Sequence, residues 1–168
     1  TPLVMNLNLD DRLAPDAVQI LEMELWKNGA VAAGGDWRVC YSQNETDAVT
    51  SCHPASDVPF IPDWPPLPGT RTRLGSGTGE RGTYGPATLW RMEAHLGAPR
   101  YPWRFQDGSL VKTSADLAWW RLLQTNPNFR IVALPLIIGN YHSHPESQAE
   151  FRVPDERPLM IDPGLSLT

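Results

Sequence analysis

The sequence predicts one α/β domain, and three observations support this class. The chain has 168 residues, a length that fits a single domain. Segments with the two-residue alternation of a strand are interspersed with segments that show the longer repeat of a helix. Hydrophobic residues make up 41% of the chain and charged residues 20%, so we expect a packed core rather than disorder.

The first part of the chain is predicted to form a strand, a helix and a second strand. Hydrophobic residues alternate with others over 3–9, which indicates a strand. Pro15 suits the first turn of a helix, an apolar stripe continues that helix, and Gly29 is suited to end it. The next strand is expected over 31–41, although two glycines interrupt it.

The remainder is predicted to contain a long loop, two helices and two short strands. Residues 42–83 are rich in proline and then glycine, which disfavours helix and central strand, and loops of this length are often functional. Helices are expected over 86–97 and after a capping Ser114. Strands are expected over 129–133 and 136–141. The predicted inward-facing positions of the helices are Leu89, Met92 and Leu96, and Leu117, Trp120 and Leu123.

Composition excludes several classes of protein. The net charge of −5 argues against a nucleic-acid partner, because phosphate binding needs a basic face. No stretch approaches the roughly 18 apolar residues of a membrane span. Two cysteines are too few for a disulfide scaffold, so a reducing compartment is expected. The expected location is the cytoplasm, with the inner face of the membrane as a variant of it.

Three groups of polar residues are candidates for chemistry. Asp10 and Asp11 follow an apolar strand, where ligands gather in open α/β sheets, and adjacent carboxylates can hold a divalent cation. Spacing alone favours the alternative that one caps the next helix and the other is solvated. Asp116 is either a helix-capping acid or a general base. His142 and His144 point to one side of an extended segment, where they could contact a metal or phosphate or simply decorate the surface.

Two other patterns are set aside. The G-x-G-x-x-G sequence at 77–82 follows a polar loop rather than a strand, so it lacks the context of a dinucleotide site. Trp119 and Trp120 are expected to pack as a helix face, although the more exposed of the two could stack on a sugar.

The order of four segments resembles the second half of a family 2 glycosyltransferase with a GT-A fold. They are an acidic motif with its helix at 8–17, an acceptor-side segment at 84–91, a segment with the catalytic base at 114–120, and closing strands with a histidine-rich end at 129–147. The resemblance covers about residues 1–150, so we expect the C-terminal part of a GT-A domain over 1–152 and a loose tail over 153–168. The expected fold is a truncated GT-A mixed sheet flanked by helices, with a long Pro/Gly-rich loop.

The resemblance implies a role for each matching residue. Asp10 and Asp11 match positions that bind the metal (Mn²⁺ or Mg²⁺) and the donor diphosphate, and His144 matches a residue beside them. Asp116 matches the base that deprotonates an acceptor hydroxyl during an inverting displacement. His142 is assigned to the same site less directly. Further acceptor-side candidates are Trp90 and Trp119. The implied partners are a nucleotide-sugar donor and a glycan or lipid-linked acceptor.

The sequence also departs from the family pattern. Asn8 stands where an acid is common, and Ala118 stands where an acid usually follows the base. The opening strands that hold the nucleotide base are missing, so the sequence is expected to be a fragment that is inactive or incomplete alone. Removing those strands would bare a sheet edge, which predicts self-association.

Two other functions compete with glycosyl transfer. A non-catalytic glycan-binding or scaffold domain would keep the fold without the reaction, as Asn8 and Ala118 suggest. A metal-dependent hydrolase built on both acids and both histidines is less favoured, because the sequence has no hydrolase motif such as H-E-x-x-H.

Overall fold

The computed structural model describes residues 2–61, 66–72, 88–95, 102–111, 115–148 and 157–161. Its strands are β1 (Leu3–Met5), β2 (Arg12–Leu13), β3 (Ala32–Cys40), β4 (His53–Pro54), β5 (Arg71–Thr72), β6 (Thr88–Arg91) and β7 (Ile131–His142). Its helices are α1 (Ala17–Lys27), α2 (Gln43–Asp47), α3 (Ala115–Gln124) and α4 (Pro145–Gln148), with 3₁₀ turns at η1 (Ala55–Asp57) and η2 (Met92–His95).

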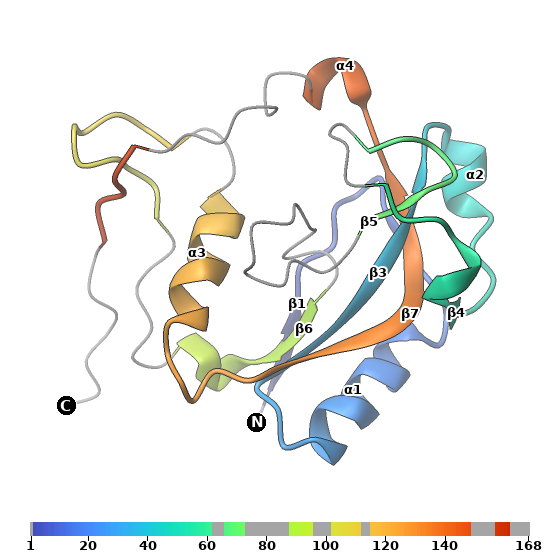
Figure 1. Cartoon of the computed structure of the whole chain (residues 1–168), viewed down its shortest axis with the longest axis horizontal. Coiled ribbons are helices and arrows are strands. Elements are labelled where there is room, and N and C mark those ends of the chain that lie inside the picture. The colour runs from blue at the N-terminus through green and yellow to red at the C-terminus, as the bar shows by residue number, and fades with distance from the viewer. Residues whose placement is uncertain are drawn as a thin grey trace.

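The described strands form one mixed sheet in the order β1-β6-β3-β7-β2 (Figure 1). The long central strands β3 and β7 are parallel, and the other pairings of named strands in the described residues are antiparallel. Short β4 pairs with β7, and β5 pairs with β3. The predicted α/β class is therefore confirmed, with a mixed sheet.

The two long helices cover opposite faces of this sheet. Ala33 and Leu89 are cross-strand partners that pack in one cluster with α1. Their neighbours Ala32 and Trp90 are also partners, and they pack in a second cluster with α3. Because successive strand residues point to opposite faces, α1 and α3 must lie on different sides (Figure 1). The buried helix residues in these clusters are Leu21 and Leu25 from α1, and Trp119, Trp120 and Leu123 from α3.

Several predicted elements are confirmed. The helix expected from Pro15 to Gly29 is α1, and the strand expected over 31–41 is β3. The helix expected after Ser114 is α3, with Trp120 and Leu123 buried as predicted, while Ser114 itself lies outside the described residues.

The helix predicted over 86–97 is wrong. Its described part is the strand β6 followed by the 3₁₀ turn η2, and Met92, predicted to face inward, is 48% exposed. The strand forms because 88–91 lies between β1 and β3 and its side chains alternate between the two faces of the sheet. Tertiary pairing therefore overrides a helix-compatible local pattern.

Three other boundaries differ from the prediction. The two strands expected over 129–133 and 136–141 are one continuous strand, β7, in which Pro135 is exposed and faces an irregularity in the register of β3. The first strand ends at Met5, beyond which Leu9 is almost fully exposed. The predicted loop over 42–83 contains the short helix α2.

The described part of the predicted loose tail, residues 157–161, is held in place. Phe105 forms a β-bridge with Leu159, and the main chain of Met160 donates a hydrogen bond to the carbonyl of Arg104. Arg157 also pairs with the Asp107 carboxylate. In the residues that can be described, none of the helices has the length and apolar character needed to cross a bilayer.

Candidate functional site

The candidate site lies at the carboxyl ends of the parallel strands β3 and β7. Cys40 and His142 are opposite each other in the register, and the main chain of Ser143 donates a hydrogen bond of 2.9 Å to the Cys40 carbonyl. A turn at 8–11, closed by a hydrogen bond from the Asp11 main chain to the Asn8 carbonyl, brings both early acids to the same end. Ligands of open α/β sheets gather at the carboxyl ends of parallel strands.

Asp10 and His144 form the exposed part of the site. His144 Nε2 lies 2.9 Å from Asp10 Oδ2, although 134 positions separate the two residues in the sequence. The side chain of Asp10 is 41% exposed and that of His144 is 53% exposed. Both polar groups can therefore reach a ligand from solvent.

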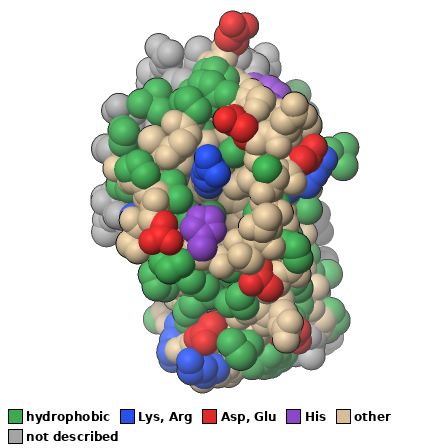
Figure 2. Space-filling model, turned by 90° about the vertical axis from the view of Figure 1, so that its right-hand side faces the viewer, with side chains coloured by type: hydrophobic (Ala, Val, Ile, Leu, Met, Phe, Trp, Pro, Cys, Tyr) green, Lys and Arg blue, Asp and Glu red, His purple; other side chains and the backbone are tan. Residues whose placement is uncertain are grey.

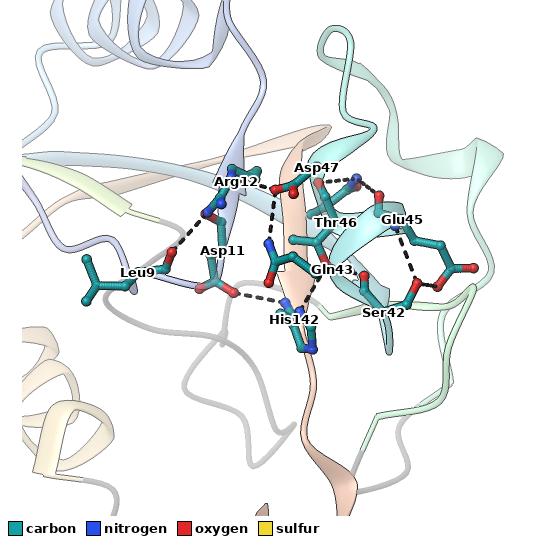
Figure 3. Close-up of polar contacts among 10 residues, drawn as sticks. Leu9, Asp11, Arg12, Ser42, Gln43, Glu45, Thr46, Asp47 and His142 are labelled. Atoms are coloured by element: carbon teal, nitrogen blue, oxygen red, sulfur yellow. Dashed lines mark hydrogen bonds and ion pairs between the residues drawn. The ribbon is translucent and has the colours of Figure 1, made fainter.

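Asp11 occupies the opposite environment, only 1% exposed. Its Oδ1 accepts a 2.9 Å hydrogen bond from the main-chain N–H of His142, and its Oδ2 accepts one of 2.9 Å from the Asn8 side chain (Figure 3 shows the first). Burial raises the pKa of Asp11 to about 6; the two hydrogen bonds oppose this rise and the neighbouring Asp10 adds to it. A buried carboxylate with a raised pKa is typical of functional sites, although it is not restricted to them.

His142 is held from two sides. Its main chain donates to Asp11, and its ring Nδ1 lies 3.4 Å from the Thr46 hydroxyl oxygen (Figure 3). That hydroxyl donates a 3.0 Å hydrogen bond to the Ser42 carbonyl, so in this arrangement it is an acceptor for an Nδ1 proton. The ring of His144 stacks on that of His142, with centroids 4.4 Å apart and an angle of 20° between planes.

The short helix α2 supports this arrangement. Ser42 caps α2: its hydroxyl oxygen accepts a hydrogen bond from the Glu45 main-chain N–H, and its hydroxyl group donates one to the Glu45 carboxylate. The side chain of Asn140 on β7 donates to the carbonyls of Glu45 and Thr46. At the far end of α2, Arg12 Nε lies 2.7 Å from Asp47 Oδ1 (Figure 3). The helix is therefore fastened both to β7 and to the residue after Asp11.

Sequence reasoning missed three members of this network. Asn8 was weighed only as a missing acid, whereas its amide binds Asp11. Thr46 and Asn140 carried no motif, and their partners are more than 90 positions away in the sequence. The one available signal was the spacing of Ser42 and Glu45, which is typical of a helix start.

The donor set fits a divalent cation only in part. Asp10 offers carboxylate oxygen and His144 offers imidazole nitrogen, ligands that Mn²⁺ accepts, while Mg²⁺ prefers oxygen alone. Both oxygens of Asp11 already accept hydrogen bonds. Within the described ranges, no group of three or more acidic, histidine or cysteine side chains is arranged to hold a metal.

Two aromatic candidates are packed in the core. Trp90 and Trp119 are 3% and 2% exposed and belong to the core between β6 and α3. Trp90 Nε1 donates a 3.0 Å hydrogen bond to His95 Nε2, and Trp119 stacks on the same ring at 5.0 Å. These contacts give both rings a packing role, and their predicted contact with an acceptor stays a prediction.

The predicted base, Asp116, lies in the first turn of α3, and its side chain is outside the described part of the structure. In Figure 1, α3 lies on the left of the molecule, whereas β7 ends at the upper right beside α4. The role of Asp116 as a base therefore stays a prediction.

Figure 2 shows the face that carries α2 and β4, where the coloured acidic, basic and hydrophobic side chains are mixed rather than gathered by charge. This face therefore resembles an ordinary solvated surface.

Comparison of the chain with models of protein families, with curated proteins and with solved structures finds no match.

Proposed function

We propose that the chain is the C-terminal part of a GT-A-type glycosyltransferase domain that transfers a sugar from a nucleotide-diphosphate donor to an acceptor hydroxyl. One observation carries the proposal. Asp10 and His144, which the family resemblance assigns to the diphosphate and metal, are in contact beside the carboxyl ends of parallel strands. A strand-end site of this kind is where α/β folds bind phosphorylated ligands.

In this proposal the exposed pair binds the donor. Asp10 and His144 would hold Mn²⁺ or Mg²⁺ together with the diphosphate, and a bound cation would offset the negative charge of the leaving nucleoside diphosphate. Asp116 accepts the proton of the acceptor hydroxyl as its oxygen attacks the anomeric carbon. The bond to the diphosphate breaks as the new glycosidic bond forms, with inversion at that carbon.

Donor binding is tested by calorimetry with UDP- and GDP-sugars in the presence of Mn²⁺ or Mg²⁺, on the full-length protein. Asp10→Asn is expected to weaken binding at least about tenfold, because it replaces a charged carboxylate ligand of the cation by a neutral amide. Asp57→Asn is the matched control, since Asp57 is an exposed acid in the turn η1 and is not part of this network. No binding by the unmodified protein, or equal loss in both variants, would contradict the proposal.

The reaction is tested separately with Asp116→Asn. Loss of a general base lowers turnover by about 100-fold or more and leaves donor affinity unchanged. Unchanged turnover would remove Asp116 from the mechanism and with it the glycosyl-transfer proposal.

A non-catalytic glycan-binding or scaffold domain is the second candidate. It is favoured by the small number of possible metal ligands. The Asn8 amide donates its hydrogen bond to Asp11, and among the described residues Asp10 and His144 are the exposed pair that could bind a cation. Binding on a glycan array without sugar-nucleotide turnover would select this candidate. Metal-dependent turnover would eliminate it.

Self-association is a separate proposal. In the described sheet β1 is an end strand, and end strands offer main-chain groups for pairing with another chain. Sedimentation at increasing concentration is expected to show a larger species, and a constant monomer would contradict this.

A further inference from the structure

We infer that Asp11 is a positioning residue rather than a ligand of the site. It holds the main chain at His142 so that the ring of His144 meets Asp10. The consequence for catalysis rests on the proposed function, whereas the positioning itself follows from the contacts of these four residues. The inference divides the two neighbouring acids into one that faces solvent and one that shapes the site.

The first step concerns what Asp11 can bind. Each of its oxygens accepts a 2.9 Å hydrogen bond, one from the His142 main chain and one from the Asn8 amide, and the residue is 1% exposed. A ligand from solvent would have to displace these donors and leave a buried N–H without its acceptor, which is costly. Asp10, with its side chain 41% exposed, meets neither obstacle.

The second step connects Asp11 to His144. Its acceptor oxygen fixes the N–H of His142, and the next N–H, that of Ser143, is fixed by the Cys40 carbonyl. Two successive peptide groups are therefore held immediately before His144. The His142 ring, placed by this main chain and lying beside Thr46, then stacks on the His144 ring at 4.4 Å.

The third step is the sequence separation. The turn at 8–11 and the end of β7 come from opposite ends of the chain, and the Asp11–His142 hydrogen bond spans 131 positions. This bond joins the segment that carries Asp10 to the segment that carries His144. The Asp11–His142 hydrogen bond is therefore suited to set the position of Asp10 relative to His144, and a ligand of the site would contact these two side chains.

The experiment measures position rather than activity. The ring nitrogen chemical shifts of His144 and the amide hydrogen exchange of His142 are recorded by NMR at one fixed pH. The variants are Asp11→Asn, which keeps an acceptor, Asp11→Leu, which removes it, and Asp10→Asn, which removes only the exposed partner. Asn8→Ala removes one of the two hydrogen bonds to Asp11 and serves if Asp11→Leu does not fold.

Asp11→Asn is expected to retain native His144 ring shifts and slow exchange at His142. Asp11→Leu should speed that exchange at least about tenfold, the change expected from loss of a hydrogen bond to a charged group. It should also move the His144 shifts toward those of Asp10→Asn, and Asn8→Ala should do so partially.

Two results would overturn the inference. One is a folded Asp11→Leu, or Asn8→Ala in its place, with native His144 shifts. The other is a folded Asp11→Asn that loses them, because the charge rather than the acceptor would then matter. Failure of the proposed function would look different, since donor binding or turnover would be absent while these NMR signatures followed the expected pattern.

Discussion

Replacing Asp11 by Asn should make the protein more stable at neutral pH. The Asp11 carboxylate is buried and accepts hydrogen bonds from the uncharged His142 main chain and Asn8 amide, and its pKa is raised from 3.8 to about 6, chiefly by burial. An asparagine keeps an oxygen for the His142 N–H, and the Asn8 amide can turn to accept from the new NH₂ group. The substitution therefore removes a buried charge with little loss of hydrogen bonding.

The sign and size of the effect follow from proton linkage. Between pH 3.8 and about 6 the unfolded chain releases the Asp11 proton while the folded chain retains it, so the free energy of unfolding falls as pH rises. The contribution is complete below about pH 4 and lost above about pH 6. One pKa unit corresponds to about 1.4 kcal/mol, so the full difference is worth up to about 3 kcal/mol. Screening by solvent near the turn reduces the expected value to about 1–3 kcal/mol.

The assay is urea unfolding of the parent and of Asp11→Asn over a pH series from about pH 4 to about pH 7.5. The variant's advantage should grow by about 1–3 kcal/mol across this range. Asp47→Asn controls for the removal of one exposed acid. An advantage that is constant with pH, or that shrinks as pH rises, would refute the assignment of a raised pKa to Asp11.

Three further predictions concern stability and reactivity. Gly139→Ala should destabilise by about 1–3 kcal/mol in chemical denaturation, because an added Cβ would lie closer than 3.0 Å to the Trp37 ring; an unchanged midpoint would contradict this close packing. Ser42→Ala should cost about 1 kcal/mol, since it removes the cap that accepts from the Glu45 main chain; Ser42→Asn should recover most of the loss. Cys52 should be alkylated at least about 100-fold more slowly in the folded than in the unfolded chain at about pH 8, because burial raises its pKa to about 12; equal rates would show that the thiol is not protected.

The elements that sequence predicted well are those whose signal is local. The apolar stripe of α1 includes Leu21 and Leu25, which recur at helical spacing and are fully buried. β3 is buried at every position except Arg38, which suits a strand that is covered on both faces, and α1 and α3 do lie on opposite faces. In these segments the local pattern and the tertiary environment favour the same structure.

The elements that sequence missed depend on partners far along the chain. Residues 88–91 have a composition that a helix tolerates, and their strand is set by hydrogen bonding to β1 and β3. The two strands predicted over 129–133 and 136–141 are continuous, because Pro135 between them is tolerated in β7 where the register with β3 is irregular. Neither partner nor irregularity can be read from the segment itself.

The candidate site could be predicted only in part from the sequence: the acids and histidines were candidates, whereas Asn8, Thr46 and Asn140 were missed as contacts and the role of Asp116 stays a prediction. Convergence of Asp10, Asp11 and the histidines was expected from the order of the segments, and their contacts agree with that expectation. The alternative was that one of the two acids caps the next helix and the other is solvated. The contacts differ from it, because Asp11 accepts a hydrogen bond from β7 and Asp10 lies beside His144. The burial of the aromatic candidates Trp90 and Trp119 could not be predicted from their own segments, because it depends on how α3 packs against β6.

The contrast between Asp10 and Asp11 shows why two identical neighbours can have different roles. In the tight turn at 8–11 consecutive side chains leave the main chain in different directions, so only one of the two acids can face β7. Asp11 is the inner acid because its carboxylate accepts the hydrogen bond of the buried His142 N–H, which would otherwise lack an acceptor. The outer acid is then left beside His144, where a ligand can reach it. The inner side chain contributes an acceptor that joins the turn to the end of β7, and this contact keeps the outer carboxylate beside His144. The geometry of the exposed pair therefore depends on that acceptor, whereas the buried charge lowers stability at neutral pH.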